Sequence, residues 1–174
     1  MERGAPRYEE NMKALVVFYS YDGNTRFIAE AIAKAARADR LELTPRNEMK
    51  SWGALKYLRG GLAVLARKRP ELLPLDRDPM GYDVVFVGSP VWAGTFAPAM
   101  RAFLATSPLS GRKIALFCCC GGGKGRIFKS MREALIGNDV LAEKDFVDPL
   151  KHTPDLSAAV AEEWALCVMK AAGA

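Results

Sequence analysis

Residues 15–25 read LVVFYSYDGNT, and this stretch decides the fold class of the chain. It opens with an uninterrupted apolar run, which is typical of a strand buried on both faces. A polar turn containing Gly23 follows, and an apolar helical pattern begins at or near Thr25. A strand that leads through a tight turn into a helix N-terminus can hold an anion, because the first N–H groups of a helix have no intrahelical acceptor. The same residue types are also ordinary caps and turn residues, so a purely structural role stays open.

The rest of the chain repeats this alternation of strand and helix. Strands are expected over residues 13–19, 41–44, 83–88, 113–118 and 140–147. Helices are expected over 27–36, over 51–68 with an interruption at Gly60-Gly61, around Met100 to Leu104, around Ile127 to Leu135, and over 155–171, where Leu156, Val160, Trp164 and Val168 share one face. Such alternation predicts a three-layer α/β domain with a parallel sheet.

Three of the expected strands lead into loops of glycine and other small residues, at 20–25, 89–95 and 118–123. In a parallel sheet these loops emerge at the same carboxyl edge, where ligands bind. Trp92 in the second loop could lie flat against a planar ring, or it could pack on the core. The third loop offers backbone groups at close range to the polar edge of a heterocycle. Together the three loops favour a phosphate-bearing ligand over a purely structural turn.

The composition suits one soluble domain. The chain has 174 residues, of which 26% are charged. Residues 1–11 are polar without an apolar core, so we expect a loose tail there, no secretory signal, and a domain over 12–174. No apolar run approaches the roughly 20 residues of a membrane span. Three of the cysteines are consecutive, which excludes an evenly spaced disulfide framework and favours a reducing, cytoplasmic location.

The chain is basic, with a formal net charge of +5. Residues 45–79 contain eight Lys and Arg residues against four acidic ones, so much of the excess lies in this segment. The segment could bind an acidic protein or a phosphate-bearing substrate, or it could be a solvated helix face without a binding role. Nucleic-acid binding is not expected, because the only interleaved aromatic residues, Trp52 and Tyr57, sit on or beside the apolar stripe.

At this point the sequence resembles a known family. Residues 20–25 resemble the phosphate loop of flavodoxins, and residues 88–92 and 117–122 resemble the two loops of that family that surround the flavin ring. The resemblance, to a short-chain flavodoxin, covers essentially the whole chain from Met12. It implies a five-stranded parallel sheet of flavodoxin-like order and one non-covalent FMN.

The resemblance also implies a set of cofactor-binding residues. These are Ser20, Tyr21, Asp22, Gly23, Asn24 and Thr25 in the phosphate loop, Pro90, Val91, Trp92 and Gly94 in the second loop, and Cys119, Cys120, Gly121 and Gly122 at the pyrimidine edge. Cys119 or Cys120 could be a redox-active thiol at a helix N-terminus, or the three cysteines could be small apolar packing. No catalytic residue or metal site is predicted, and the single histidine, His152, is expected in a surface loop.

Three functions remain open from the sequence. The first is electron transfer through FMN, with an acidic redox protein or a small-molecule electron acceptor as partner. The second is an FMN-dependent oxidoreductase that passes electrons from NAD(P)H to a quinone. The third is a flavin-free module that binds another phosphorylated ligand or a protein at the same edge.

Overall fold

Five parallel strands form the centre of the computed structural model, which describes residues 12–47, 69–106 and 109–173. They are β1 (Ala14–Phe18), β2 (Asp39–Glu42), β3 (Val84–Trp92), β5 (Lys113–Cys120) and β6 (Asp139–Val147). Their order across the sheet is β2-β1-β3-β5-β6, and every neighbouring pair is parallel. This is the order of a flavodoxin-type doubly wound sheet. The predicted fold class is confirmed.

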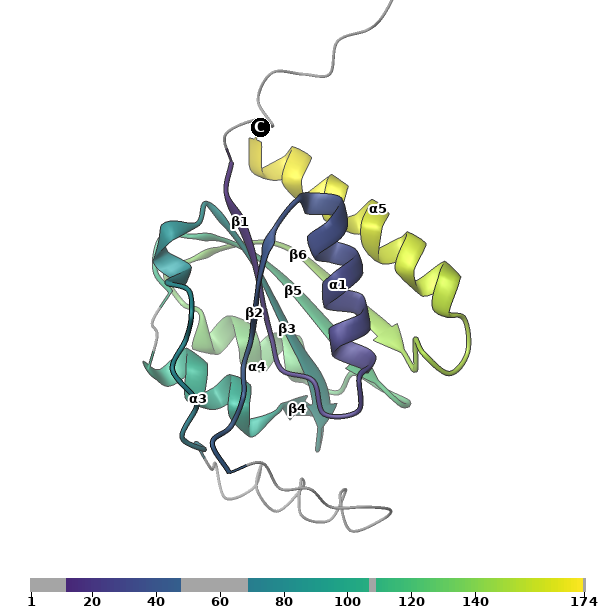
Figure 1. Cartoon of the computed structure of the whole chain (residues 1–174), viewed down its shortest axis with the longest axis horizontal. Helices are drawn as coiled ribbons and strands as arrows, with labels where there is room; N and C mark the ends of the chain where they lie inside the picture. Colours follow the sequence, from purple (N-terminus) through teal and green to yellow (C-terminus); the bar gives the residue numbers. More distant parts are fainter. Residues whose placement is uncertain (1–11, 48–68, 107–108, 174) are drawn as a thin grey trace, which may run out of the picture.

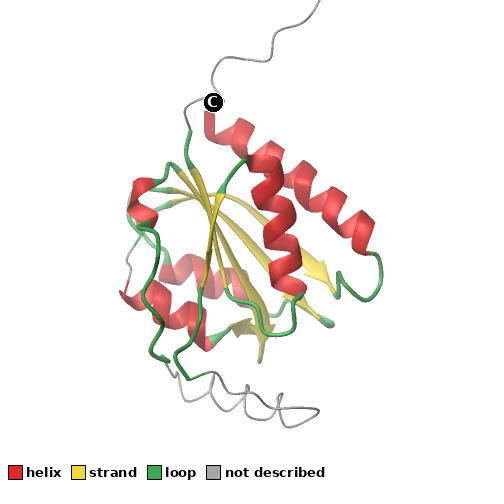
Figure 2. Cartoon of the chain, in the orientation of Figure 1, coloured by secondary structure: helices red, strands yellow, loops and turns green. Residues whose placement is uncertain are grey.

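The helices form a layer on each side of the sheet (Figure 1, Figure 2). Helices α1 (Asn24–Ala36) and α5 (Pro154–Gly173) cover one face, and α3 (Pro98–Thr106) and α4 (Ile127–Ala134) cover the other. The alternation of side chains along β1 explains the two cores. Val16 and Phe18 pack under α1 and α5, whereas Leu15 and Val17 pack under α3 and α4. A 3₁₀ turn, η1 (Pro79–Gly81), precedes β3.

Strands β3 and β5 extend further than predicted. The sequence indicated loops over 89–95 and 118–123, but Ser89 and Pro90 pair with Cys118 and Cys119 in the ladder. Strand β3 then turns at Ala93-Gly94 into β4 (Thr95–Phe96), which runs back antiparallel to it. Proline is depleted in strands, so pairing with the neighbouring strand decides the conformation of Pro90 here.

Helix α5 packs on the sheet with most of the predicted face. Val168 is buried, and Val160 and Trp164 pack against the core, whereas Leu156 near the start of the helix is 61% exposed. The buried side chains are mostly small ones, including Ala161, Ala165 and Ala172. Small side chains let α5 approach α1 closely, and an ion pair between Lys34 Nζ and Glu162 Oε1 at 2.9 Å joins the two helices.

Strand β2 is an edge strand, as predicted, and the segment after residue 69 pairs with the stretch that follows β2. The Leu73 N–H donates to the Thr44 carbonyl at 2.8 Å, and the Arg46 N–H donates to the Glu71 carbonyl at 2.8 Å. The predicted 51–68 helix, most of the basic 45–79 segment and the 1–11 tail lie outside the described residues. Within the described ranges, no helix has the length and apolar character that crossing a membrane requires.

Candidate functional site

The turn between β1 and α1 is built around Gly23. This residue is the N-cap of α1 and has a φ of 92°, in the left-handed region that favours glycine. The first helical hydrogen bond runs from the Phe27 N–H to the Gly23 carbonyl at 2.9 Å. The first turn of the helix contains no acidic residue, and a glycine cap has no side chain to occupy the N–H groups. The N-terminus of α1 therefore has backbone donors and partial positive charge available for an anion.

Two hydroxyl groups of this turn are buried without a partner. Ser20 is 6% exposed and Thr25 is fully buried. Neither Ser20 Oγ nor Thr25 Oγ1 forms a hydrogen bond with any group in the described part of the chain. A buried polar group left without a hydrogen bond lowers the stability of the fold by about 1–3 kcal/mol. Each hydroxyl therefore destabilises the protein when no ligand is bound. An acceptor placed in the turn would remove this cost.

Both hydroxyls lie on the side of the sheet that α1 covers. Phe18 packs under α1, and strand alternation puts Ser20 on the same side. Thr25 opens the helix itself and lies beside the thiol of Cys119, without a well-formed hydrogen bond to it. The two donors thus flank the same helix N-terminus as the backbone N–H groups.

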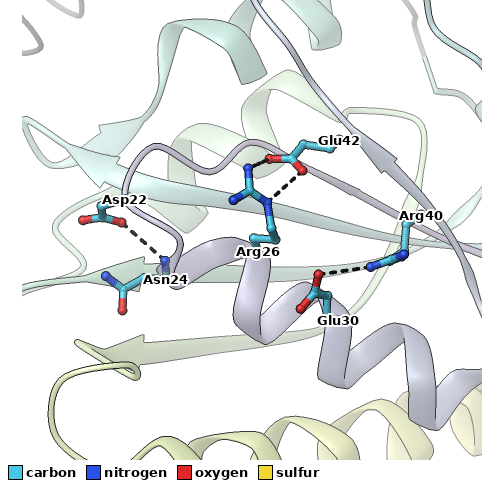
Figure 3. A network of polar contacts seen from close by, with 6 residues as sticks. All are labelled: Asp22, Asn24, Arg26, Glu30, Arg40 and Glu42. Carbon is cyan, nitrogen blue, oxygen red and sulfur yellow. Dashed lines mark hydrogen bonds and ion pairs between the residues drawn. The ribbon is translucent and has the colours of Figure 1, made fainter. Parts of the chain in front are cut away.

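The other polar side chains in and next to the turn form hydrogen bonds or ion pairs within the protein. The Leu150 N–H donates to Asn24 Oδ1 at 3.1 Å, and the Asn24 N–H makes a long contact of 3.4 Å with Asp22 Oδ1. Figure 3 shows Arg26 reaching from the first turn of α1 to Glu42 on β2, with Nε to Oε2 at 3.0 Å and Nη2 to Oε1 at 2.7 Å. The one basic side chain at the start of α1 is thus paired with a carboxylate.

The end of β3 places Trp92 against two tyrosines. The Trp92 ring meets Tyr21 edge to face at 5.5 Å between centroids and Tyr19 at 6.1 Å. Trp92 is half-buried, and it packs against the core beneath α3 and α4. One part of the indole is therefore fixed by neighbours while the rest remains accessible to a ligand.

The tip of the β3–β4 hairpin is tied to the loop that precedes α4. The Arg126 N–H donates to the Gly94 carbonyl at 2.7 Å. The backbones approach so closely that a Cβ on Gly125 would lie 2.6 Å from the Gly94 Cα. Ala93 and Gly94 both have positive φ, 47° and 75°, as a tight two-residue hairpin of this kind requires. The second predicted loop is therefore joined to the segment that follows the third predicted loop.

The three consecutive cysteines belong to strand β5 and not to a helix N-terminus. Cys118, Cys119 and Cys120 are all buried, with free thiols. Burial raises the pKa of each thiol above its ordinary value, and for Cys119 the nearby Asp22 carboxylate adds to this rise in pKa. A reactive thiol needs a lowered pKa. The structure therefore favours small apolar packing over the redox-active thiol that the sequence left open.

Comparison with known protein families matches residues 13–148 to flavodoxin. The chain belongs to the flavodoxin family. A flavoprotein of Lactobacillus acidophilus NCFM, crystallised in complex with FMN, is 24% identical, covers 77% of this chain and 93% of its own, and has a TM-score of 0.67. A candidate flavoprotein of Bacteroides eggerthii is 22% identical, with coverages of 91% and 98% and a TM-score of 0.74. Two-electron reduced flavodoxin from Megasphaera elsdenii is 18% identical, with coverages of 90% and 98% and a TM-score of 0.57. No curated protein matches the sequence.

On this flavodoxin fold the predicted binding residues occupy three kinds of position. The residues of the turn, 20–25, lie together at the start of α1. Val91, Trp92 and Gly94 are half-buried at the hairpin, whereas Pro90 is buried in the ladder. Gly121 and Gly122 are exposed, but Cys119 and Cys120 are buried strand residues. The roles of these residues toward a cofactor remain predictions.

The sequence analysis missed the loop after the last strand of the sheet. A hollow of about 460 Å³ at the site is lined by residues of the turn and of this loop: Asp22, Asn24, Gly121, Asp148, Leu150 and Lys151. The signal was available, because β6 is also parallel and its loop must emerge at the same edge. His152 is exposed in this loop, in agreement with the prediction.

Proposed function

We propose that this chain binds one FMN non-covalently at the carboxyl edge of its sheet and transfers electrons through it. The observation that carries the proposal is the pair of buried hydroxyls, Ser20 Oγ and Thr25 Oγ1, which have no partner among the described residues. Donors without acceptors beside a helix N-terminus suit phosphate oxygens. Membership of the flavodoxin family, and the FMN complex of the Lactobacillus acidophilus flavoprotein, support FMN as the ligand that carries this phosphate.

Each part of the site would have a separate task. The hydroxyls of Ser20 and Thr25, with the N–H groups of the first turn of α1, would hold the phosphate. Val91 and Trp92 offer apolar surface to the ring, and exposed Gly121 and Gly122 allow close approach to the backbone. The bound flavin supplies the redox chemistry, and the protein supplies binding, orientation and electrostatics.

The charge of the chain supports an acidic partner for electron transfer, with a small-molecule acceptor as the other option. The exposed loop 121–126 lies at the site and carries Lys124 and Arg126. Lys124 Nζ pairs with Asp145 Oδ1 at 2.9 Å, and the Arg126 backbone is held by the hairpin. A basic loop held in place beside the flavin would favour approach of a negatively charged protein, and added salt should slow that approach.

The test of FMN binding is a titration of the full chain with FMN, followed by flavin fluorescence and visible absorption. Thr25→Val should weaken binding at least about tenfold, because it removes a charge-assisted hydrogen bond to the phosphate. Thr44→Val, at an exposed threonine beyond β2, is the matched control and should leave the affinity unchanged. A wild-type chain that leaves the spectrum of added FMN unaltered would overturn the proposal.

Stability separates a binding role of Thr25 from a packing role. In the protein without flavin, Thr25→Val should raise the melting temperature while it weakens FMN binding. A residue important only for packing would not give effects of opposite sign. NADPH oxidation by the FMN-loaded chain with a quinone and no partner protein would replace the carrier role with the oxidoreductase role.

A further inference from the structure

We propose that the loop after β6, residues 148–153, is a wall of the phosphate site, and that Lys151 is the cation that neutralises the phosphate. The inference rests on the proposed function, because it names a further residue of the same site. Among the residues that line the hollow, Lys151 is the only one with a positive charge.

The loop is attached directly to the phosphate turn. The Leu150 N–H donates to Asn24 Oδ1 at 3.1 Å. A Cβ added to Gly23 would lie 3.5 Å from Leu150 Cδ1, so the Leu150 side chain lies next to the turn. Asn24 therefore holds Leu150, and with it the adjacent Lys151, beside the N-terminus of α1.

The loop is also fixed by its own hydrogen bonds. The Asp148 N–H donates to the Cys120 carbonyl at 2.9 Å, which attaches the loop to the end of β5. The N–H groups of Lys151 and His152 both donate to the Asp148 carbonyl, at 2.9 Å and 3.2 Å. Asp148 itself has a φ of 38°, a left-handed conformation that closes the turn. The backbone that carries Lys151 is thus held at both ends.

The charges of the hollow require a cation if a phosphate is to bind. Two carboxylates, Asp22 and Asp148, line it, and Arg26 is already paired with Glu42. His152 Nε2 lies 3.8 Å from Asp148 Oδ2. Lys151 forms no ion pair with any described residue, so its charge is available. A phosphate dianion beside two carboxylates would be repelled without such a charge.

The unpartnered hydroxyls of the adjoining turn favour an anion as the ligand. Ser20 Oγ and Thr25 Oγ1 are more than nine-tenths buried on the α1 side of the same turn. Two carboxylates, Asp22 and Asp148, line the hollow, and no group of three or more metal-ligating side chains occurs in the described ranges. Hydroxyl and backbone donors with one free lysine match a phosphomonoester.

The test compares FMN with riboflavin, which lacks the phosphate, in titrations of the full chain. Lys151→Gln should weaken FMN binding by roughly five- to tenfold and leave riboflavin binding unchanged. Lys129→Gln removes the same charge from an exposed position on α4 and should change neither affinity. Lys151→Arg keeps the positive charge, so this variant should retain most of the preference for FMN over riboflavin. Circular dichroism of each variant checks that the fold is kept.

Inorganic phosphate provides a second readout without any flavin. It should raise the melting temperature of the wild-type chain and of Lys129→Gln, but not of Lys151→Gln. If FMN binds and Lys151→Gln behaves like Lys129→Gln, or loses FMN and riboflavin equally, the role of Lys151 is overturned while the proposed function stands. If FMN does not bind but phosphate binds through Lys151, the flavin is wrong and the anion site stands. If neither binds, both proposals fail.

Discussion

Two regions at the same edge of the sheet each contain a buried serine, but only one of the two hydroxyl groups has hydrogen-bond partners. Ser89, at the base of the β3–β4 hairpin, is fully buried, and its Oγ accepts a hydrogen bond from the Ala97 N–H at 3.0 Å and donates to the Pro90 carbonyl at 3.0 Å. Ser20, in the phosphate turn, is almost as buried and has no partner within the described ranges. The buried hydroxyl of the hairpin is therefore satisfied by the protein itself, whereas the buried hydroxyl of the turn is left without a hydrogen bond.

The tip of the hairpin continues this contrast. Gly94 and Gly125 lie backbone to backbone, and the Gly94 carbonyl is taken by the Arg126 N–H at 2.7 Å. The turn makes its tertiary contact through one side chain, Asn24, and leaves its helix N-terminus open. The hairpin therefore has the features of a supporting scaffold, and the turn has the features of the proposed binding region.

The largest effect is expected from Gly125→Ala in the supporting region. Gly125 has a φ of 56°, and the added Cβ would lie 2.6 Å from the Gly94 Cα. Left-handed strain and overpacking together should lower the free energy of unfolding by about 2–4 kcal/mol. Gly123→Ala is the matched control, since a Cβ there meets nothing within 4 Å. Urea unfolding of both variants measures the difference, and equal stabilities would show that the hairpin is not locked.

A smaller effect, of opposite sign in the two regions, is expected from removing each buried serine hydroxyl. Ser89→Ala should cost about 1–3 kcal/mol, because the buried Ala97 N–H would lose its acceptor. Ser20→Ala should leave the flavin-free protein equally or more stable, since a hydroxyl without a partner is removed. FMN binding should change in the reverse pattern, weakened by Ser20→Ala and little changed by Ser89→Ala. Destabilisation of similar size by both variants would contradict the division between the regions.

A still smaller effect should follow from Ala93→Gly at the hairpin tip. Ala93 has a φ of 47°, which an L-residue adopts only with strain. Glycine relieves that strain but makes the unfolded chain more flexible, so the net gain should be about 0.5–1 kcal/mol. Ala159→Gly, at an exposed position within α5, should instead lose about 1 kcal/mol. Thermal unfolding of the two variants should therefore shift in opposite directions, and a loss in both would argue that Ala93 is unstrained.

The strand-turn-helix geometry of residues 15–25 could be predicted from the sequence because its signals are local. Strand pattern, Gly23 and the start of the helix occur within one short stretch, and the structure places them as expected. The extents of β3 and β5 could not be predicted in this way. Pro90 and Cys119 become strand residues through pairing with each other across the sheet, and no local pattern encodes that pairing.

Two further features depended on contacts between distant segments. Along α5, Val168 is buried as its spacing predicted, but Ala161 and Ala165 are buried as well, and Leu156 near the start of the helix is exposed. Lys151 lines the hollow because the neighbouring Leu150 is hydrogen-bonded to Asn24, which is 126 residues away from it in the sequence. Periodicity and turn chemistry contain no information about such pairs. The order of the strands was predictable only through the family resemblance.

The smallest effect on stability near neutral pH is expected from the three cysteines of β5. The end of this strand contacts both regions. Burial raises the pKa of these thiols above the ordinary 9.0, so the folded chain keeps protons that the unfolded chain releases at high pH. Their contribution to stability is therefore constant below about pH 9 and declines as the pH rises further. At pH 8 a disulfide reagent should label only exposed Cys167 of the four free thiols in the native protein, and all four after unfolding. Rapid labelling of a second thiol would mean that the end of β5 opens beside Thr25, and it would return Cys119 and Cys120 to consideration as redox groups.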